Sequence, residues 1–280
     1  MTDSAQEAHA RKLAVAGIFD RGADEYDRIG EFFTPMGLDL VAAAGITSGE
    51  RVLDVGCGRG AVLFAAAAAV GATGWVTGID LAERMVSLTA GDAVARGIEN
   101  VTVTAGDAEE PDFPAGSFDA VLASFVLFLL PDPAAALVRY GQLLRPHGRL
   151  GFTTFGSPDP AFEAAMSSLG SFVTDGLPQR GGRQGPFGSV DGITALLASA
   201  GFAAPAVTER TYETRFRDPD EWLAWAWSHG GRATLERIPA ENLDEASAAA
   251  KVAFEQARTP EGDYAIRTAI RFTIAHPAVR

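Results

Sequence analysis

Apolar and polar residues change their spacing in regular blocks between positions 51 and 155. Short apolar runs, which indicate buried strands, are separated by longer segments whose apolar residues recur every three or four positions, as on one face of a helix. Strands and helices that alternate in this way predict an α/β fold with a doubly wound, mostly parallel sheet. The expected strands are 51–56, 75–80, 101–105, 118–124 and 149–154, and the expected helices are 59–70, 82–96 and 133–144.

Patterns in the last third of the chain predict further elements. Apolar residues alternate with polar ones over residues 264–274, which predicts a strand that is antiparallel and at or near the sheet edge. Asp218 followed by Pro219 predicts the start of a helix, because an Asp cap accepts a free backbone N–H and proline presets the first turn. Helical spacing also returns at residues 190–200.

These patterns divide the chain into four segments. We expect a helical cover over the strand ends at residues 1–50 and a ligand-binding core at 51–155. An insertion or mobile loop, rich in glycine and proline, is expected at 156–188, and residues 189–280 should complete the sheet and add helices for the second substrate. Ligands of parallel sheets sit at the carboxyl ends of the strands, so residues at those ends are the first candidates for a site.

Charge and cysteine content narrow the choice of partners. The 280 residues carry 36 acidic side chains against 23 lysines and arginines, a net charge of −13, which disfavours nucleic acid and anionic membranes as partners. Cys57 is the only cysteine, so an internal disulfide and a multi-thiolate zinc site are excluded, and no histidine spacing predicts a metal site. The N-terminal stretch lacks the apolar run of a signal peptide, and we expect a cytoplasmic protein.

The sharpest motif is Val52-Leu53-Asp54-Val55-Gly56-Cys57-Gly58-Arg59-Gly60, where a strand enters a glycine turn that opens a helix. Glycines let the backbone turn sharply and let a ligand approach closely. The spacing from Gly56 to Ala61 also fits the dinucleotide fingerprint, and Asp80 follows 19 residues later, so a nicotinamide enzyme is a rival interpretation. Asp54 disfavours it, because a carboxylate here repels a pyrophosphate but attracts a ligand with an ammonium and a sulfonium, such as S-adenosylmethionine.

Two more acidic residues follow the next two strands. Asp80 ends the second strand, where its side chain suits two ribose hydroxyls or, alternatively, caps the following helix. Asp107 follows the third strand, where it suits an adenine amino group, although alone it would fit an ordinary turn. Met85 is placed to pack on adenine or in the core, and Cys57 is more typical of a small side chain beside a ligand than of a nucleophile.

These motifs resemble the class I S-adenosylmethionine-dependent methyltransferases over residues 51–155. The resemblance implies a Rossmann-like fold with a seven-stranded sheet. The sequence departs from the family at His147, where a glycine is usual. Residues 221–230 resemble a subgroup that acts on small molecules, typical of bacterial secondary metabolism. The matching segments of the core are 53–60, 78–81, 106–108, 117–121 and 144–150.

The resemblance also implies roles for individual residues. The glycine turn holds the methionine part of the cofactor, Asp80 the ribose and Asp107 the adenine, while Ser124 closes the site at the end of the fourth strand. Tyr26, which forms a Tyr-Asp pair with Asp27, reaches the cofactor carboxylate. The cofactor-binding residues that we expect are Tyr26, Asp54, Gly56, Cys57, Gly58, Asp80, Leu81, Met85, Asp107, Ala108 and Ser124.

The expected reaction moves a methyl group from S-adenosylmethionine, which leaves as S-adenosylhomocysteine, to a small, largely apolar metabolite. The residues leave two alternatives open: a fold relative that catalyses a cyclisation, and a cofactor-binding module without turnover. They also leave open the acceptor atom and the oligomeric state. His229 is the candidate general base, with a packing histidine as the alternative. An aromatic group that fits either an acceptor pocket or the core consists of Phe32, Phe33, Trp222, Trp225 and Trp227.

Overall fold

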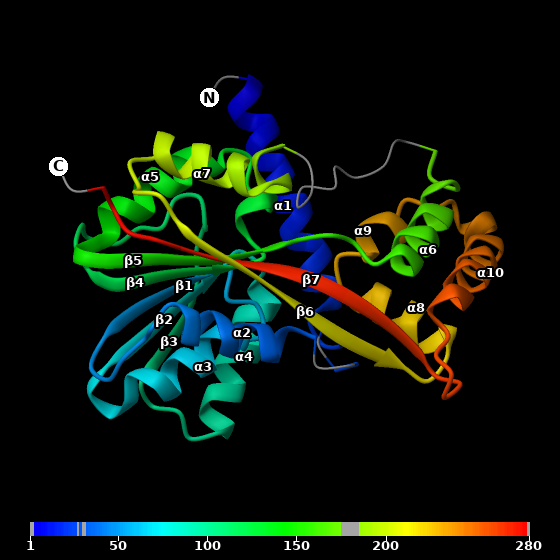
Figure 1. Ribbon diagram of the computed structural model, residues 1–280, viewed down its shortest axis with the longest axis horizontal. Coiled ribbons are helices and arrows are strands. Elements are labelled where there is room, and N and C mark those ends of the chain that lie inside the picture. The colour runs from blue at the N-terminus through cyan, green and yellow to red at the C-terminus, as the bar shows by residue number, and fades with distance from the viewer. Residues whose placement is uncertain (1–2, 27, 30–31, 175–184, 279–280) are drawn as a thin grey trace.

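The computed structural model describes residues 3–26, 28–29, 32–174 and 185–278, and a seven-stranded sheet forms its centre (Figure 1). The strand order is β3-β2-β1-β4-β5-β7-β6, with β1 to β5 parallel and β7 antiparallel to both β5 and β6. The expected doubly wound, mostly parallel sheet and the late antiparallel strand are confirmed. The strands are β1 (Arg51–Val55), β2 (Trp75–Asp80), β3 (Val101–Ala105), β4 (Phe118–Ser124), β5 (Leu144–Phe155), β6 (Ala206–Phe216) and β7 (Tyr264–Ala275).

Helices cover both faces of the sheet, because its apolar strands need apolar partners on each side. On one face α2 and α3 bury Met36 and Leu63, and on the other α5 and α7 bury Leu137 and Ile193. Figure 1 shows the two layers, with α1 standing beside the sheet. The helices are α1 (Asp3–Gly22), α2 (Phe33–Ala43), α3 (Ala61–Val70), α4 (Glu83–Ala95), α5 (Pro133–Leu143), α6 (Pro160–Gly170), α7 (Val190–Ser199), α8 (Pro219–Ser228), α9 (Arg232–Leu235) and α10 (Leu243–Phe254).

Capping residues fix where two of the predicted helices begin. The Asp132 side chain accepts a hydrogen bond from the Ala135 N–H at 2.9 Å at the start of α5. At the start of α8, Asp218 accepts one from the Glu221 N–H at 2.8 Å. A proline occupies the first turn in both helices, so the helix starts expected from the Asp-Pro pairs are confirmed.

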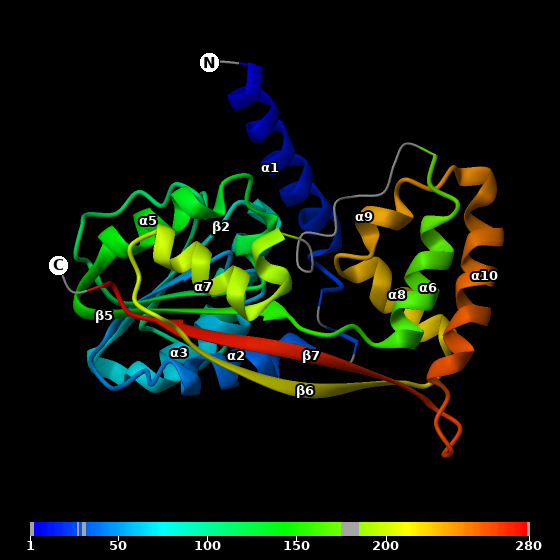
Figure 2. The ribbon, with the colours of Figure 1, turned by 45° about the horizontal axis from the view of Figure 1, so that its top comes forward.

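The segment 156–188 was expected to be an insertion or mobile loop, and the expectation of a loop is corrected because the segment contains helix α6. Asp159 caps this helix by accepting hydrogen bonds from the Ala161 and Phe162 N–H groups, and Pro160 occupies its first turn, so this Asp-Pro pair also starts a helix. Figure 2 shows α6 beside α10, in a group with α8 and α9 next to the long strands β6 and β7. The glycine-rich positions 181–184 of the segment lie outside the described residues.

β6 is a strand that the sequence pattern did not predict. Among the described strands it pairs only with β7, at the sheet edge, and most of its residues are exposed, so polar residues such as Glu209 and Arg210 hide the alternation. β5 also begins earlier than the expected strand. His147, near its start, has a φ of +69°, a left-handed conformation that favours glycine and that explains why the family has glycine at this position.

The close packing of α2 on α3 generates a test of the fold. A Cβ at Gly37 would lie 2.4 Å from the Ala61 carbonyl oxygen, a backbone atom that cannot rotate away. We expect Gly37→Ala to lower the free energy of unfolding by about 1–3 kcal/mol in denaturant titrations. Gly91→Ala is the matched control, because a Cβ there meets open space on α4 and alanine favours helix, so it should stabilise by about 0.5–1 kcal/mol. Equal stabilities of the two variants would contradict this packing.

Candidate active site

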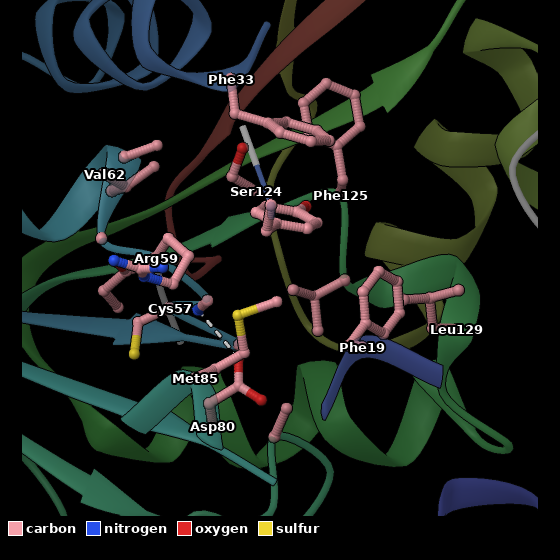
Figure 3. Close-up of a pocket in the computed structure, with 18 of the residues that line it drawn as sticks. Phe19, Phe33, Cys57, Arg59, Val62, Asp80, Met85, Ser124, Phe125 and Leu129 are labelled. Atoms are coloured by element: carbon pink, nitrogen blue, oxygen red, sulfur yellow. Dashed lines mark hydrogen bonds between the residues drawn. The ribbon is translucent and has the colours of Figure 1, made fainter. Parts of the chain in front are cut away.

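The carboxyl ends of β1 to β4 open onto one cavity of about 510 Å³ (Figure 3). α1 covers it on one side with Phe19, and the start of α2 contributes Phe33. The structure brings together all eleven residues expected to bind the cofactor, since each of them lines this cavity. They are Tyr26, Asp54, Gly56, Cys57, Gly58, Asp80, Leu81, Met85, Asp107, Ala108 and Ser124.

The glycine turn is held between β2 and the segment that follows β4. Gly56 has a φ of +64°, and a Cβ there would lie 2.3 Å from Val126 Cγ2, so the backbone angle and the contact both require glycine. On the other side, the Cys57 N–H donates to the Ile79 carbonyl oxygen at 2.9 Å. The turn therefore lies between β1 and β4, where the strand order changes direction and ligands of such sheets bind.

Asp80 ties the end of β2 to the glycine turn. Its Oδ2 accepts a hydrogen bond from the Gly58 N–H at 2.8 Å, and its Oδ1 accepts one from the Ala82 N–H at 2.9 Å. α4 begins at Glu83 without a side-chain cap, so Asp80 fixes the turn before the helix and does not cap it. Burial raises the pKa of Asp80. Its oxygens keep further lone pairs, which leaves room for the ribose hydroxyls that the sequence predicts.

Asp54 lies at the end of β1 with 1% of its surface exposed. Within the described part of the chain, its Oδ2 has no hydrogen-bond partner. Burial, together with the negative charge of Asp80, raises the pKa of Asp54 well above its usual value. A buried carboxylate oxygen without a hydrogen-bond partner is unfavourable, and a ligand cation would relieve this, so the site fits the ammonium group expected here.

Asp107 differs from Asp54 because a lysine of α1 already pairs with it. Lys12 Nζ lies 2.5 Å from Asp107 Oδ2 and 2.8 Å from Glu109 Oε2. Burial lowers the pKa of Lys12, but the hydrogen bonds and charges of the two carboxylates outweigh it and raise the pKa overall. Sequence reasoning missed Lys12, because no local pattern connects it to a residue 95 positions away. The pair holds α1 over the end of β3.

An aromatic surface forms the other end of the cavity. The Phe125 ring centroid lies 5.4 Å from that of Phe33 and 4.7 Å from that of Phe155, and Phe128 lies 5.7 Å from Phe155. All four side chains line the cavity. Figure 3 shows Phe33 and Phe125 on the side away from Asp80. The cavity therefore has an acidic, polar end and an apolar, aromatic end.

The tryptophans of α8 that the structure buries belong to the core. Trp222 is fully buried and stacks on Phe254 with ring centroids 4.5 Å apart. Trp225 is buried against Phe32 at 5.4 Å. Of the aromatic group that the sequence left open between pocket and core, Phe33 is the member that lines the cavity.

His229 lies behind the cavity wall and is not one of the residues that line it. It is 5% exposed, and its ring centroid lies 4.8 Å from Tyr26 and 5.5 Å from Phe33. Its Nδ1 is 2.8 Å from the Trp225 carbonyl oxygen, which can only accept, so the proton is assigned to Nδ1 and the lone pair to Nε2. Burial lowers the pKa of His229 to about 4. These contacts favour the packing alternative, while the role as a base stays a prediction.

Asp27, the expected partner of Tyr26, lies outside the described residues.

Two other features bear on possible partners. In the ranges that the structure describes, no helix combines the length and the apolar character needed to cross a membrane. Over the same ranges, no three His, Cys, Asp or Glu side chains gather in a way that could hold a metal ion.

Comparison with known proteins identifies the family. A family model described as a methyltransferase domain matches residues 46–176, which contain the glycine turn and all three acidic strand ends. The chain is also 41% identical to nocamycin O-methyltransferase of Saccharothrix syringae over 234 residues, which are 79% of this chain and 84% of that protein. The chain belongs to the class I S-adenosylmethionine-dependent methyltransferases. This methyltransferase therefore takes its methyl group from S-adenosylmethionine.

Two further comparisons agree with this assignment. Aklanonic acid methyltransferase DauC of Streptomyces sp. (strain C5) is 47% identical to this methyltransferase over 154 residues, which are 55% of this chain and 68% of that protein. The solved structure of the YcgJ protein from Bacillus subtilis has a TM-score of 0.60 at 18% identity and covers 88% of this chain and 99% of that chain. The second likeness concerns the fold alone. The expected fold, enzyme class and cofactor are thereby confirmed.

The charge state of Asp54 predicts a pH dependence of cofactor binding. Burial raises the pKa of Asp54, so the group must lose a proton before it can pair with an ammonium group as a carboxylate. We expect the affinity for S-adenosylhomocysteine to fall as the pH is lowered from about 8 to about 5. Asp54→Asn should weaken binding by about 1–3 kcal/mol and flatten this dependence, as calorimetric titration can measure.

The matched ligand for this experiment is 5′-methylthioadenosine, which lacks the ammonium and carboxylate groups. Its affinity should change little in Asp54→Asn, because the substitution then removes no ligand contact. An equal loss of affinity for both ligands, or an unchanged pH dependence in the variant, would remove Asp54 from the ammonium site.

Proposed function

We propose that this methyltransferase is an O-methyltransferase of secondary metabolism, whose acceptor is a small, largely apolar molecule with an acidic oxygen, such as a carboxylic acid. The observation that carries the proposal is the aromatic surface of Phe33, Phe125, Phe128 and Phe155, which shares one cavity with the acidic strand ends. Apolar ligands bind to such a surface by burial and ring contact. The relatives support the acceptor class: one is named an O-methyltransferase and the other is named for an acid.

The polar end of the cavity suits the cofactor. When bound, S-adenosylmethionine supplies a methyl carbon on a positively charged sulfur. An electron-rich acceptor atom can attack this carbon from the side opposite the sulfur, which then leaves as the neutral thioether of S-adenosylhomocysteine. We propose that Asp54 pairs with the ammonium group, that Asp80 accepts hydrogen bonds from the ribose and that Asp107 accepts one from the adenine. α1, anchored by Lys12, excludes water from this end, which strengthens these electrostatic contacts.

The acidity of the acceptor oxygen is inferred from the side chains around it. Among the described residues that line the cavity there is no histidine, and the three aspartates belong to the cofactor end. An ordinary hydroxyl needs a general base to remove its proton, whereas an oxygen that ionises near neutral pH needs none. Orientation of the acceptor on the aromatic surface and exclusion of water then supply the acceleration.

Other features support a small acceptor. A net charge of −13 supports a small molecule over a nucleic acid. We also propose a cytoplasmic location, which a single free cysteine, Cys57, supports. A cyclase and a binding module without turnover are not favoured, because relatives at 41% and 47% identity are both named methyltransferases.

The proposed function predicts methyl transfer to an aromatic acid. Anthraquinone-2-carboxylic acid and aklanonic acid are the test acceptors, and 2-aminoanthraquinone is a matched compound whose acceptor atom is nitrogen. We expect the methyl ester and S-adenosylhomocysteine to form in equal amounts with the acids only, as measured by mass spectrometry. Preferred methylation of the amine, or cofactor binding with no transfer to either acid, would contradict the proposed acceptor class.

A second prediction concerns His229. The ring packs against Tyr26, Phe33 and Trp225, so His229→Gln should lower the free energy of unfolding by about 1–3 kcal/mol and leave turnover within a few-fold of wild type. Burial lowers the pKa of His229 from 6.5 to about 4, so its neutral ring stabilises the fold above pH 6.5, and this contribution is lost as the pH falls toward 4. The free energy of unfolding of His229→Gln should therefore lack this decrease between pH 6.5 and about 4.

The same variant tests the role as a base. A pH–rate profile of wild type and His229→Gln should show the same acidic limb if the ring only packs. A fall in turnover of roughly 100-fold, together with loss of that limb in the variant, would establish His229 as the general base.

A further inference from the structure

Phe125 has an unusual backbone conformation for a large residue. Its φ is +58°, in the left-handed region, and His147 is the only other non-glycine residue with a positive φ in the described part of the chain. A Cβ makes this conformation unfavourable, and a bulky side chain adopts it rarely. His147 is exposed near the start of β5, whereas Phe125 is buried and lines the cavity.

Neighbours on both sides hold Phe125 in this conformation. Its N–H donates to Thr153 Oγ1 at 3.1 Å and to the Thr153 carbonyl oxygen at 3.3 Å. The Ser124 hydroxyl lies 2.9 Å from Thr153 Oγ1, which fixes the end of β4 against β5. The next residue, Val126, packs against Gly56, where a Cβ has no room. β5 and the glycine turn thus fix the strained backbone together.

This conformation places the Phe125 ring in the aromatic surface of the cavity. Its centroid lies 5.4 Å from that of Phe33 and 4.7 Å from that of Phe155. Figure 3 shows Phe125 beside Phe33 and Ser124, across the cavity from Asp80. A molecule that approaches the cofactor end from the aromatic end therefore meets this ring.

We propose that Phe125 is a specificity-determining residue for the methyl acceptor, and that its left-handed backbone fixes the ring as a flat apolar surface on which an aromatic acceptor stacks. The inference rests on the proposed function, because it takes the aromatic end as the acceptor site. Backbone strain lowers stability, and it persists where the surrounding structure over-determines it and the direction of the side chain is used. Here the hydrogen bonds to Thr153 over-determine the backbone of Phe125. The contacts of its ring with Phe33 and Phe155 in the cavity show where the direction of the side chain is used.

The test compares Phe125→Gly and Phe125→Leu, with His147→Gly as the matched control that removes the other strained side chain outside the cavity. Calorimetry measures the affinity for S-adenosylhomocysteine first, and then that of the saturated protein for anthraquinone-2-carboxylic acid. We expect Phe125→Gly to weaken binding of the acid by roughly 10-fold or more, Phe125→Leu to weaken it less, and His147→Gly to leave it unchanged. The affinity for S-adenosylhomocysteine should stay within about 3-fold of wild type throughout.

A second measurement checks the backbone without any ligand. Phe125→Ala and Phe125→Gly both remove the ring, but only glycine adopts a φ of +58° freely. We expect Phe125→Gly to melt about 2–4 °C above Phe125→Ala. Equal melting temperatures would overturn the claim that a strained backbone fixes the ring.

Three binding results would overturn the inference, and they separate it from the proposed function. If wild type binds and methylates the acid and Phe125→Gly binds it equally well, the inference fails and the proposed function stands. If Phe125→Gly loses S-adenosylhomocysteine and the acid to the same extent, Phe125 serves the cofactor end and not acceptor choice. If wild type binds no aromatic acid, the proposed function fails and the inference fails with it.

Discussion

The turn from β1 into α3 packs so closely against the chain that follows β4 that Gly56 has no room for a Cβ. The same turn donates a backbone hydrogen bond to Asp80 from Gly58, so two neighbouring strands fix its position. The parallel strand order then brings the ends of β1, β2 and β3, with their acidic side chains, to one edge. On the other side, the contact with Val126 fixes the residue after Phe125 and thus one edge of the aromatic surface. One tightly packed turn therefore sets how the two ends of the cavity lie relative to each other.

The three acidic residues at the strand ends have different surroundings, so the three positions along the cavity differ in how well they can receive a cation. Asp107 is paired with Lys12 of α1, and Asp80 accepts two backbone hydrogen bonds. Asp54 is buried, and no described group partners its Oδ2. We therefore propose that a cationic ligand group binds at the end of β1, because Asp107 already has a cationic partner and Asp80 already has two backbone partners. The end of β3, by contrast, is covered by α1, which Lys12 anchors to Asp107 and Glu109.

The core of the fold and the polar end of the site could be predicted from the sequence, because both depend on local patterns: the spacing of apolar residues, the glycine turn and an acidic residue after each strand. What could not be predicted depends on packing between distant segments. The edge strand β6 carries too many polar residues to alternate, and α6 begins at Asp159 and Pro160, a pair equally typical of loops. Lys12 meets Asp107 only in the folded chain, and the left-handed backbone of Phe125 comes from its contacts and not from its residue type.

The central claim is that the buried Asp54 carboxyl group, whose Oδ2 has no hydrogen-bond partner among the described residues, receives the ammonium group of the cofactor. Because burial raises the pKa of Asp54, ligand binding must then release a proton. Protons can be counted by calorimetry in two buffers of different ionisation enthalpy at about pH 6, with 5′-methylthioadenosine as the ligand that lacks an ammonium group. We predict a net release of protons on binding of S-adenosylhomocysteine and none on binding of 5′-methylthioadenosine. Equal proton exchange for the two ligands would contradict the claim, since the charge state of Asp54 would then not respond to the ligand's cation.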